Sequence, residues 1–266
     1  MADVPARRRR FAALHETGTF LMPNAWDVGS ARLLESIGFG AIATTSSGFA
    51  ASLGRLDQNV TREELMSHVE ALTAAVDIPL SVDAEDGYAD DAAGLEATVA
   101  GLAAAGAAGI SIEDYRPGRG LLDIITATER VGTMVETANS LGITVTARAE
   151  NHLYGVDDLE DTIDRLRAYA GAGAHVLYAP GLITADQLGR LVAAVDRAVN
   201  ALLLPPGPTV GEMSEIGVRR LSTGGALTWV AYGAVERAAR ELRAEGTQTY
   251  ANGMLSREVR ETAFEG

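Results

Sequence analysis

Short apolar segments rich in β-branched residues alternate with longer amphipathic segments along the whole chain, eight of each. Strands that alternate with helices in this way form parallel sheets, because each helix returns the chain to the same end of the sheet. Eight such units in 266 residues predict one α/β domain over residues 1–266, a (β/α)8 TIM barrel, with a doubly wound open sheet as the alternative. The expected strands lie at residues 19–24, 41–46, 79–85, 109–114, 144–150, 175–181, 198–204 and 218–224.

The segments between the expected strands carry the end signals of helices. Thr61 and Glu64 form a T-x-x-E capping box, which satisfies free amides in the first turn of a helix. A glycine closes many of the helical patterns, as a C-cap often does; these are Gly38, Gly106, Gly142, Gly173 and Gly217. The last helix is expected at about residues 226–245, and the tail to residue 266 is expected to pack on a neighbouring subunit or to fray.

Composition and charge exclude several classes of function. The chain is 47% hydrophobic and can bury a large core, but no apolar stretch approaches the roughly 20 residues of a membrane span. A formal net charge of −14 disfavours nucleic acid and anionic membrane surfaces as partners. Residues 1–11 contain four arginines without a following apolar run or cleavage site, so they are not a secretory signal, and a cytoplasmic protein is expected.

Two residue types are missing from the sequence. The absence of cysteine excludes disulfides, thiolate metal sites and a cysteine nucleophile or acid. All 22 basic residues are arginine, and the absence of lysine excludes Schiff-base chemistry and a Walker-type phosphate loop. A carbon–carbon or phosphorus–carbon enzyme of this composition therefore needs a metal ion as its electron sink.

Carboxylates stand where several of the expected strands end. Asp83 and Glu85 end the third strand, where residues two apart point to the same side, and Glu113 ends the fourth. A core does not tolerate unpaired carboxylates, so acids that converge in this way indicate a site for a hard cation, Mg²⁺ or Mn²⁺. Mg²⁺ commonly keeps several waters, so one or two direct carboxylates suffice. The alternative is that these acids cap helices or form ion pairs at the barrel rim.

Two further segments at strand ends are candidates for binding an anion. Ser46, Ser47 and Gly48 follow the second strand and offer hydroxyl and backbone N–H groups to a carboxylate or phosphate. Arg148 emerges from the apolar fifth strand and needs a partner, either a substrate anion or a carboxylate at the rim. The four histidines show no zinc-site spacing, and His15 is expected on a solvated helical stretch.

These motifs, in this order, resemble the isocitrate lyase/phosphoenolpyruvate mutase superfamily over nearly the whole chain. The segments that carry the resemblance are PNAWDVGSARLLESIGFGAIATTSSG, SLGRLD, DAEDGY, IED, ARAE and GVRRLSTGGAL. The first and the last are similar to a small mutase-like branch. The resemblance implies a (β/α)8 barrel that forms a homo-oligomer, usually a tetramer, in which the last helix (here about residues 226–245) is exchanged with a neighbouring subunit.

The resemblance also implies roles for individual residues. Mg²⁺ would be held directly or through water by Asp83, Glu85 and Glu113. The substrate-binding candidates are Trp26 in the segment after the first strand, Ser46, Ser47, Gly48, Asp83 and Arg148. Arg148 and Asp57, an acid near the metal, are catalytic candidates by the resemblance. Tyr88 and Tyr115 are further catalytic candidates, because either hydroxyl could return a proton to the substrate.

One segment departs from the pattern of the superfamily. The lyase branches carry Lys-Lys-Cys-Gly-His on a gating loop after the fourth strand, with the cysteine as catalytic acid, whereas this chain reads DYRPGRGLLD there. Cleavage of isocitrate or 2-methylisocitrate by the usual acid is therefore not expected. Tyr115, Arg116 and Arg119 are what this shorter loop offers to a substrate.

These observations leave three hypotheses for the function open. In the first, a Mg²⁺-dependent lyase or decarboxylase breaks a carbon–carbon bond of a small 2-oxo acid or related dicarboxylate through an enolate, and water, Tyr88 or Tyr115 returns the proton. In the second, the same site acts on the phosphorus–carbon bond of a phosphonate such as phosphonopyruvate, which Arg116 and Arg119 favour. In the third, the barrel binds a 2-oxo acid without turnover.

Overall fold

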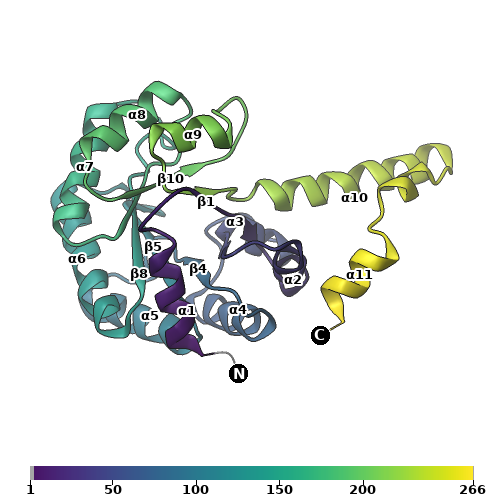
Figure 1. Ribbon diagram of the computed structural model, residues 1–266, viewed down its shortest axis with the longest axis horizontal. Coiled ribbons are helices and arrows are strands. Elements are labelled where there is room, and N and C mark those ends of the chain that lie inside the picture. The colour runs from purple at the N-terminus through teal and green to yellow at the C-terminus, as the bar shows by residue number, and fades with distance from the viewer. Residues whose placement is uncertain (1–2, 266) are drawn as a thin grey trace.

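A computed structural model describes residues 3–265, and its main sheet is parallel throughout and curves into a barrel with helices on the outside (Figure 1). The order of the strands is β1-β11-β10-β9-β8-β5-β4-β3-β2. Their bounds are β1 (Phe20–Met22), β2 (Asn24–Ala25), β3 (Ile42–Thr44), β4 (Leu80–Asp83), β5 (Gly109–Glu113), β8 (Thr144–Arg148), β9 (Val176–Tyr178), β10 (Ala198–Leu202) and β11 (Arg220–Ser222). A separate antiparallel hairpin is formed by β6 (Tyr115–Arg116) and β7 (Gly120–Leu121).

The strands β1 and β2 are two halves of the first barrel strand. β1 pairs with β11, with Met22 opposite Ser222, and β2 pairs with β3, with Asn24 opposite Ala43. Pro23 lies between them and has no N–H to donate, but its carbonyl accepts a hydrogen bond from the Ala43 amide at 2.9 Å. The nine strands of this sheet therefore occupy eight positions around a barrel, and the predicted (β/α)8 fold is confirmed.

Most of the helices cover the outside of the barrel, whereas α10 extends away from it (Figure 1). Their bounds are α1 (Val4–Ala13), α2 (Val28–Ile37), α3 (Ser46–Ser52), α4 (Arg62–Ala75), α5 (Ala92–Ala104), α6 (Ile124–Leu141), α7 (Leu159–Gly171), α8 (Ala185–Ala194), α9 (Val210–Ile216), α10 (Ala226–Glu245), the 3₁₀ helix η1 (Thr249–Gly253) and α11 (Arg257–Phe264). The Thr61–Glu64 capping box is formed as predicted. Left-handed C-caps are formed, also as predicted, at Gly38, Gly142 and Gly217.

Helix α1 is not among the helices expected between the strands, although a solvated helical stretch is expected around His15. In the structure, Arg8 donates hydrogen bonds of 2.7–3.0 Å to the carbonyls of Ala103, Ala107 and Leu141, at the ends of the neighbouring helices. Phe11 is completely buried. The arginine stems and this ring therefore close the end of the barrel opposite the carboxyl ends of the strands.

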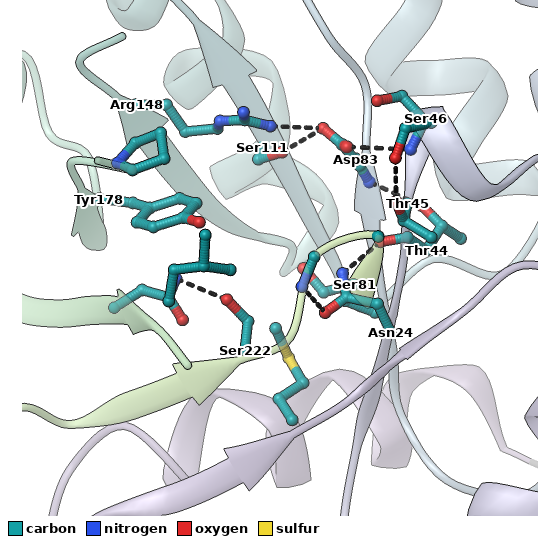
Figure 2. Close-up of a pocket in the computed structure, with 18 of the residues that line it drawn as sticks. Asn24, Thr44, Thr45, Ser46, Ser81, Asp83, Ser111, Arg148, Tyr178 and Ser222 are labelled. Atoms are coloured by element: carbon teal, nitrogen blue, oxygen red, sulfur yellow. Dashed lines mark hydrogen bonds and ion pairs between the residues drawn. The ribbon is translucent and has the colours of Figure 1, made fainter. Parts of the chain in front are cut away.

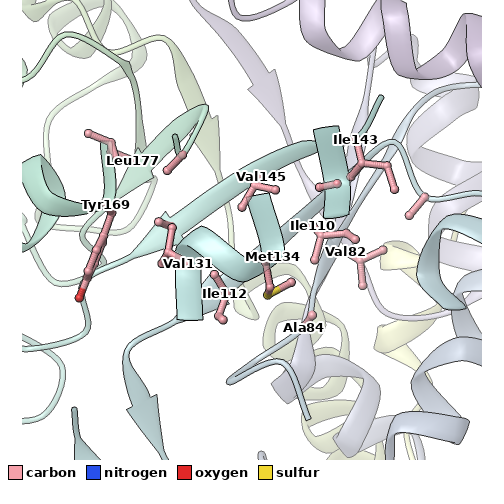
Figure 3. Packing of buried hydrophobic residues seen from close by; sticks show 14 of the residues in the cluster. Val82, Ala84, Ile110, Ile112, Val131, Met134, Ile143, Val145, Tyr169 and Leu177 are labelled. Carbon is pink, nitrogen blue, oxygen red and sulfur yellow. The ribbon is translucent and has the colours of Figure 1, made fainter. Parts of the chain in front are cut away.

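Alternate strand residues face opposite sides of the barrel wall. Ile110 and Ile112 of β5 and Val145 of β8 pack in the apolar cluster with Val131 and Met134 of α6 (Figure 3). The residues between them face the inside of the barrel, where a polar group gathers: Ser81, Ser111, Thr146, Asn200, Arg220 and Ser222. Barrel interiors are usually filled by bulky branched side chains, so this polar interior leaves room for a ligand.

Helix α10 has the bounds that the sequence predicts, and it leaves the barrel as an isolated arm (Figure 1). Thr228 is its one buried residue, whereas Trp229, Val230 and Val235 are 56, 66 and 65% exposed. The chain then turns back through η1, and α11 packs against α2. Within residues 3–265, no helix combines the length and the apolar character that a membrane span requires.

Candidate active site

A cavity of about 220 Å³ opens at the carboxyl ends of the strands and extends into the polar interior of the barrel (Figure 2). Every barrel strand contributes to its lining. The predicted site residues that line it are Ser46, Ser47, Asp57, Asp83 and Arg148. Those that do not line it are Trp26, Gly48, Glu85, Tyr88, Glu113 and Tyr115. The structure therefore brings five of the eleven predicted residues together around one space and places the other six behind or beside it.

Asp83 is the carboxylate at the centre of this site (Figure 2). Its Oδ1 atom lies 2.7 Å from Nη1 of Arg148, and its Oδ2 atom accepts a hydrogen bond from the Ser46 amide at 3.1 Å. The Asp83 amide donates to the Thr44 hydroxyl at 2.8 Å, which ties the end of β4 to the end of β3. These contacts fix both the backbone and the carboxylate of Asp83 at the edge of the cavity.

Arg148 contacts three carboxylates at once. In addition to Asp83, its Nη2 atom lies 3.3 Å from Glu113 Oε2 and its Nε atom 2.7 Å from Glu150 Oε1. The guanidinium also lies over the ring of Tyr178, 5.5 Å from the centroid. Burial raises the pKa of Glu113 well above its usual value and raises that of Glu150, against the opposing effect of Arg148. The cluster thus contains three carboxyl groups and one guanidinium in a buried place, and burial favours the protonated form of Glu113 and Glu150 there.

Glu85 does not lie on β4 as the sequence predicts, because the strand ends at Asp83. The argument that residues two apart on a strand face the same cation is therefore wrong for this pair. Glu85 and Tyr88 have φ of +45° and +54°, in the left-handed region that non-glycine residues rarely adopt. The Tyr88 hydroxyl donates to Glu85 Oε1 at 2.7 Å, and burial raises the pKa of Glu85 to about 7. This turn places Glu85 behind the cavity.

Asp114, the second acid of the IED motif, has a structural role. Its Oδ1 atom accepts from the Glu150 amide at 2.8 Å, and its Oδ2 atom accepts from Arg165 Nη1 at 3.0 Å and from the Tyr169 hydroxyl at 2.6 Å. All of these groups are buried. Asp114 therefore orients the segment that carries Glu150 toward Arg148.

Ser46 and Ser47 begin α3 rather than lying in a loop, and Thr45 caps this helix. A Cβ atom on Gly48 would lie 2.4 Å from Thr228 Oγ1 and 2.6 Å from a methyl of Thr45, so only glycine fits there. Trp26 packs behind Gly48, its Cβ atom 3.0 Å from the same position. Gly48 and Trp26 therefore set the position of the two serines.

The hairpin after β5 does not present its arginines to the cavity. Arg116 is buried and pairs with Asp86 at 2.8 Å and with Asp90 at 3.0 Å, and Arg119 pairs with Asp90 at 2.9 Å. Tyr115 stacks on Tyr154 with ring centroids 3.4 Å apart. Neither arginine lines the cavity: Arg116 is buried in its ion pairs, and Arg119 forms a pair at the surface.

Asp57 is the second carboxylate on the cavity wall. It follows α3, and desolvation raises its pKa, against the opposing effect of the nearby Ser46 side chain. The nearby Gln58 donates to the Tyr154 hydroxyl at 3.0 Å, which links the Asp57 segment to the segment after β8. Asp57 can therefore exchange a proton with a molecule in the cavity.

Several lining residues are absent from the sequence-based predictions. Tyr178, Asn200, Arg220 and Ser222 come from the last three strands, and Asn24 comes from β2. The alternation of residues along a strand identifies 220 and 222 as one face. The alternation alone does not show which of the two faces of the strand points into the barrel. Only the closed barrel in the structure shows this.

The acids of the site would suit a hard cation only if a single carboxylate held it directly. No group of three histidine or acidic side chains within residues 3–265 is close enough to hold a metal ion together. Asp83 presents its carboxylate to the cavity, whereas Glu85 and Glu113 are buried behind it. An all-oxygen set with more carboxyl groups than cations would suit Mg²⁺, which commonly takes one or two carboxylates and keeps several waters.

Comparison with known proteins agrees with this architecture. The sequence pattern of the phosphoenolpyruvate phosphomutase family matches residues 11–243. A crystal structure of a lyase/mutase-type protein from Burkholderia cenocepacia J2315 is 41% identical, covers 99% of this chain and 98% of its own, and has a TM-score of 0.94. The 2-methylisocitrate lyase of Salmonella typhimurium is 29% identical over 89% of this chain and 84% of its own length. The oxaloacetate decarboxylase of Bradyrhizobium sp. strain ORS 278 is 30% identical over 73% and 68%, respectively.

The barrel and the acid-lined cavity at the carboxyl ends of its strands define a TIM-barrel enzyme of the lyase or mutase class. The chain belongs to the phosphoenolpyruvate phosphomutase family, and through it to the isocitrate lyase/phosphoenolpyruvate mutase superfamily that its motifs resemble.

Proposed function

We propose that this chain is a Mg²⁺-dependent enzyme that cleaves a carbon–carbon bond of a small 2-oxo acid or a related dicarboxylate, as a lyase or decarboxylase, through an enolate. Mn²⁺ is the alternative metal. The observation that carries the proposal is the set of contacts from Asp83, Glu113 and Glu150 to the single guanidinium of Arg148. Buried carboxyl groups in excess of their cations either stay protonated or bind further positive charge, and a divalent cation would supply that charge.

The chain supplies ligands for the metal and for the substrate on the same wall of the cavity. Asp83 would hold the metal directly, and Glu85 and Glu113 would hold it through water. When bound, Mg²⁺ supplies a Lewis acid that withdraws electron density from the oxygens of the substrate. Ser46 and Ser47 line the cavity beside Asp83 and offer hydroxyl groups to the carboxylate and 2-oxo group.

Arg148 and Asp57 have different tasks in this proposal. The guanidinium of Arg148, held in place by its carboxylate partners, stabilises the negative charge that develops on the enolate. The Tyr88 hydroxyl is engaged with Glu85, and burial raises the pKa of Tyr88, so it releases a proton poorly. Tyr115 does not line the cavity. We therefore assign the return of the proton to water, with Asp57 as the group that exchanges a proton with it.

The names of two relatives support this choice of bond. One relative cleaves 2-methylisocitrate and the other decarboxylates oxaloacetate. Because this chain has no cysteine to serve as the usual acid of the lyase branches, we propose an oxaloacetate-like acid as the substrate. The phosphonate alternative loses its supporting observation, since Arg116 and Arg119 pair with Asp86 and Asp90.

Proton and phosphorus NMR of the purified protein with Mg²⁺ tests the proposal. The panel comprises oxaloacetate, 2-methylisocitrate, other 2-oxo and 2-hydroxy diacids, and phosphonopyruvate, each repeated with EDTA. Loss of a dicarboxylate above the non-enzymatic Mg²⁺ rate supports the proposal. A shifted phosphorus signal would instead select the phosphonate reaction, and Mg²⁺-dependent line broadening of a 2-oxo acid without turnover would select a barrel that only binds.

We also propose a homo-oligomer, a tetramer or a dimer, in which residues 226–266 of one single-domain subunit lie at an interface with a neighbour. The support is the apolar surface of α10, including Trp229, Val230 and Val235, which no other part of residues 3–265 covers. Patches of this kind mark interaction sites. We further propose that the protein is cytoplasmic and has small-molecule partners, without nucleic acid or membrane as a partner, in keeping with its charge of −14.

A further inference from the structure

Arg220 is a buried guanidinium inside the barrel that has only neutral partners. It lies on β11, is 3% exposed and lines the cavity. Its Nε atom donates to Asn200 Oδ1 at 2.8 Å, its Nη2 atom to Thr146 Oγ1 at 3.0 Å, and its Nη1 atom lies 3.4 Å from His15 Nε2. In the part of the chain that the structure describes, no carboxylate pairs with it.

The histidine beside Arg220 is neutral. His15 Nδ1 lies 2.9 Å from the Phe11 carbonyl, so Nδ1 carries the proton and the lone pair of Nε2 faces the guanidinium. Burial and the adjacent Arg220 lower the pKa of His15 to about 3. The expectation that His15 is solvated is therefore wrong, and this residue adds no negative charge to balance Arg220.

A buried charge without a partner is costly, and hydrophobic residues commonly fill this kind of inward position. A guanidinium has five N–H donors, and the three contacts leave two of them for a further acceptor. Arg148, in contrast, is neutralised by three carboxylates. Of the two guanidinium groups on the cavity wall, Arg220 is thus the one that still lacks an anion.

We propose that Arg220 determines specificity by binding a second anionic group of the substrate, a carboxylate, at the inner end of the cavity. This inference rests on the proposed function, which places the other end of the substrate beside Asp83. Thr146, which contacts Arg220, and Arg148, which contacts Asp83, are two residues apart on β8, so the level of Arg220 and the level of the proposed metal site are about 7 Å apart along this strand. A short acid with an anionic group at each end reaches both levels, and a monocarboxylate leaves Arg220 without a partner.

Matched ligands test this assignment on the full chain with Mg²⁺. Malate and 2-hydroxybutyrate have the same four-carbon length and the same 2-hydroxy acid group, and they differ in the second carboxylate. We expect calorimetry to show that malate binds about 10- to 100-fold more tightly. Equal affinities in the wild-type protein would overturn the proposal without any variant.

Variants then assign the preference to Arg220. In Arg220→Gln the malate preference is expected to fall to within about threefold, and Arg220→Lys is expected to keep part of it because the charge remains. Arg219→Gln is the matched control, because this neighbouring arginine donates to the Gly18 carbonyl at 2.8 Å, outside the cavity lining. A purely structural role of Arg220 would change both affinities together, so an unchanged ratio in Arg220→Gln would overturn the proposal.

A third ligand and the turnover assay separate the possible failures. If phosphonolactate binds more tightly than malate to the wild-type protein, and Arg220→Gln loses this difference, the group that Arg220 binds is a phosphonate and the carboxylate assignment is overturned. An Arg220-dependent malate preference without turnover of any 2-oxo acid would contradict the proposed function alone. If oxaloacetate is turned over but the preference for malate over 2-hydroxybutyrate is unchanged in Arg220→Gln, only this inference is contradicted.

Discussion

The guanidinium of Arg148 on β8 reaches across β5 to the carboxylate of Asp83 on β4, and the two groups meet at 2.7 Å. The proposed metal and this arginine therefore share one carboxylate. Glu113 and Glu150 hold the other nitrogens of the guanidinium, which keeps it beside Asp83. The geometry places the proposed ligand of the metal and the cation that stabilises the enolate in direct contact.

Replacement of Arg148 is expected to destabilise the protein strongly. Arg148→Met leaves buried carboxylates without their cation, so we expect the free energy of unfolding to fall by about 3–5 kcal/mol in urea titrations with EDTA. Arg9→Met is the control, because the Arg9 side chain is 72% exposed and its loss is expected to cost less than about 1 kcal/mol. A loss in Arg148→Met no larger than in the control would show that the cluster is not held by this arginine.

The raised pKa of Glu85 predicts that the free energy of unfolding depends on pH. Burial raises its pKa from 4.5 to about 7 in the folded protein, so the folded state binds this proton more tightly than the unfolded state. Stability is therefore expected to fall as pH rises from about 4.5 to 7, by up to about 3 kcal/mol from this group. Denaturation of the EDTA-treated protein across this range measures the effect. Glu85→Gln should lack this component of the slope, and identical slopes in the two proteins would contradict the assignment.

The close packing around Gly48 predicts that a larger residue at this position displaces the substrate-binding serines. Gly48→Ala places a methyl 2.4 Å from Thr228 Oγ1, so we expect a loss of about 1–3 kcal/mol in unfolding free energy and weaker substrate binding. Gly40→Ala is the matched control, since a Cβ atom there meets nothing within 4 Å. Equal stability and equal KM in the two variants would mean that the position of α3 does not depend on this contact.

The exposed face of α10 predicts the state of assembly. A Val230→Glu, Val235→Glu double variant adds charge to side chains that are 66 and 65% exposed in the isolated chain. If this face lies in a subunit interface, the variant is expected to shift the protein toward monomer in size-exclusion chromatography with light scattering. Arg240→Glu, a change of charge on the same helix, is the comparison variant. A monomeric wild-type protein would contradict the proposed interface directly.

The sequence alone predicts the barrel and many helix ends well, because these depend on local patterns. The bounds of α10 and the capping box at Thr61 are local signals, and both are confirmed. The division of the first strand into two halves is harder to predict. The residues before Pro23 pair with β11 and those after it pair with β3, and these pairings are known only from the closed barrel. Helix α1 is missed for a related reason: its arginines look solvated until their carbonyl partners are in place.

The site is predicted less completely than the fold. Asp83 and Arg148 are identified as candidates because polar residues end apolar strands, and the structure places them in contact. Glu85 is misplaced because the backbone leaves the strand after Asp83 and takes a positive φ. Arg220 is missed because its importance comes from the absence of a counter-ion within residues 3–265, which no local pattern shows.

The most direct test of the central claim is the turnover of the 2-oxo acid, oxaloacetate in our proposal, by wild-type protein and by Asp83→Asn, with Mg²⁺ and with EDTA. Proton NMR of the substrate and product measures the rate. We expect Mg²⁺-dependent turnover in the wild type and a loss of at least about 100-fold in Asp83→Asn. Asp77→Asn, at a side chain 89% exposed, should be unaffected. Undiminished and still metal-dependent turnover in Asp83→Asn would contradict the account.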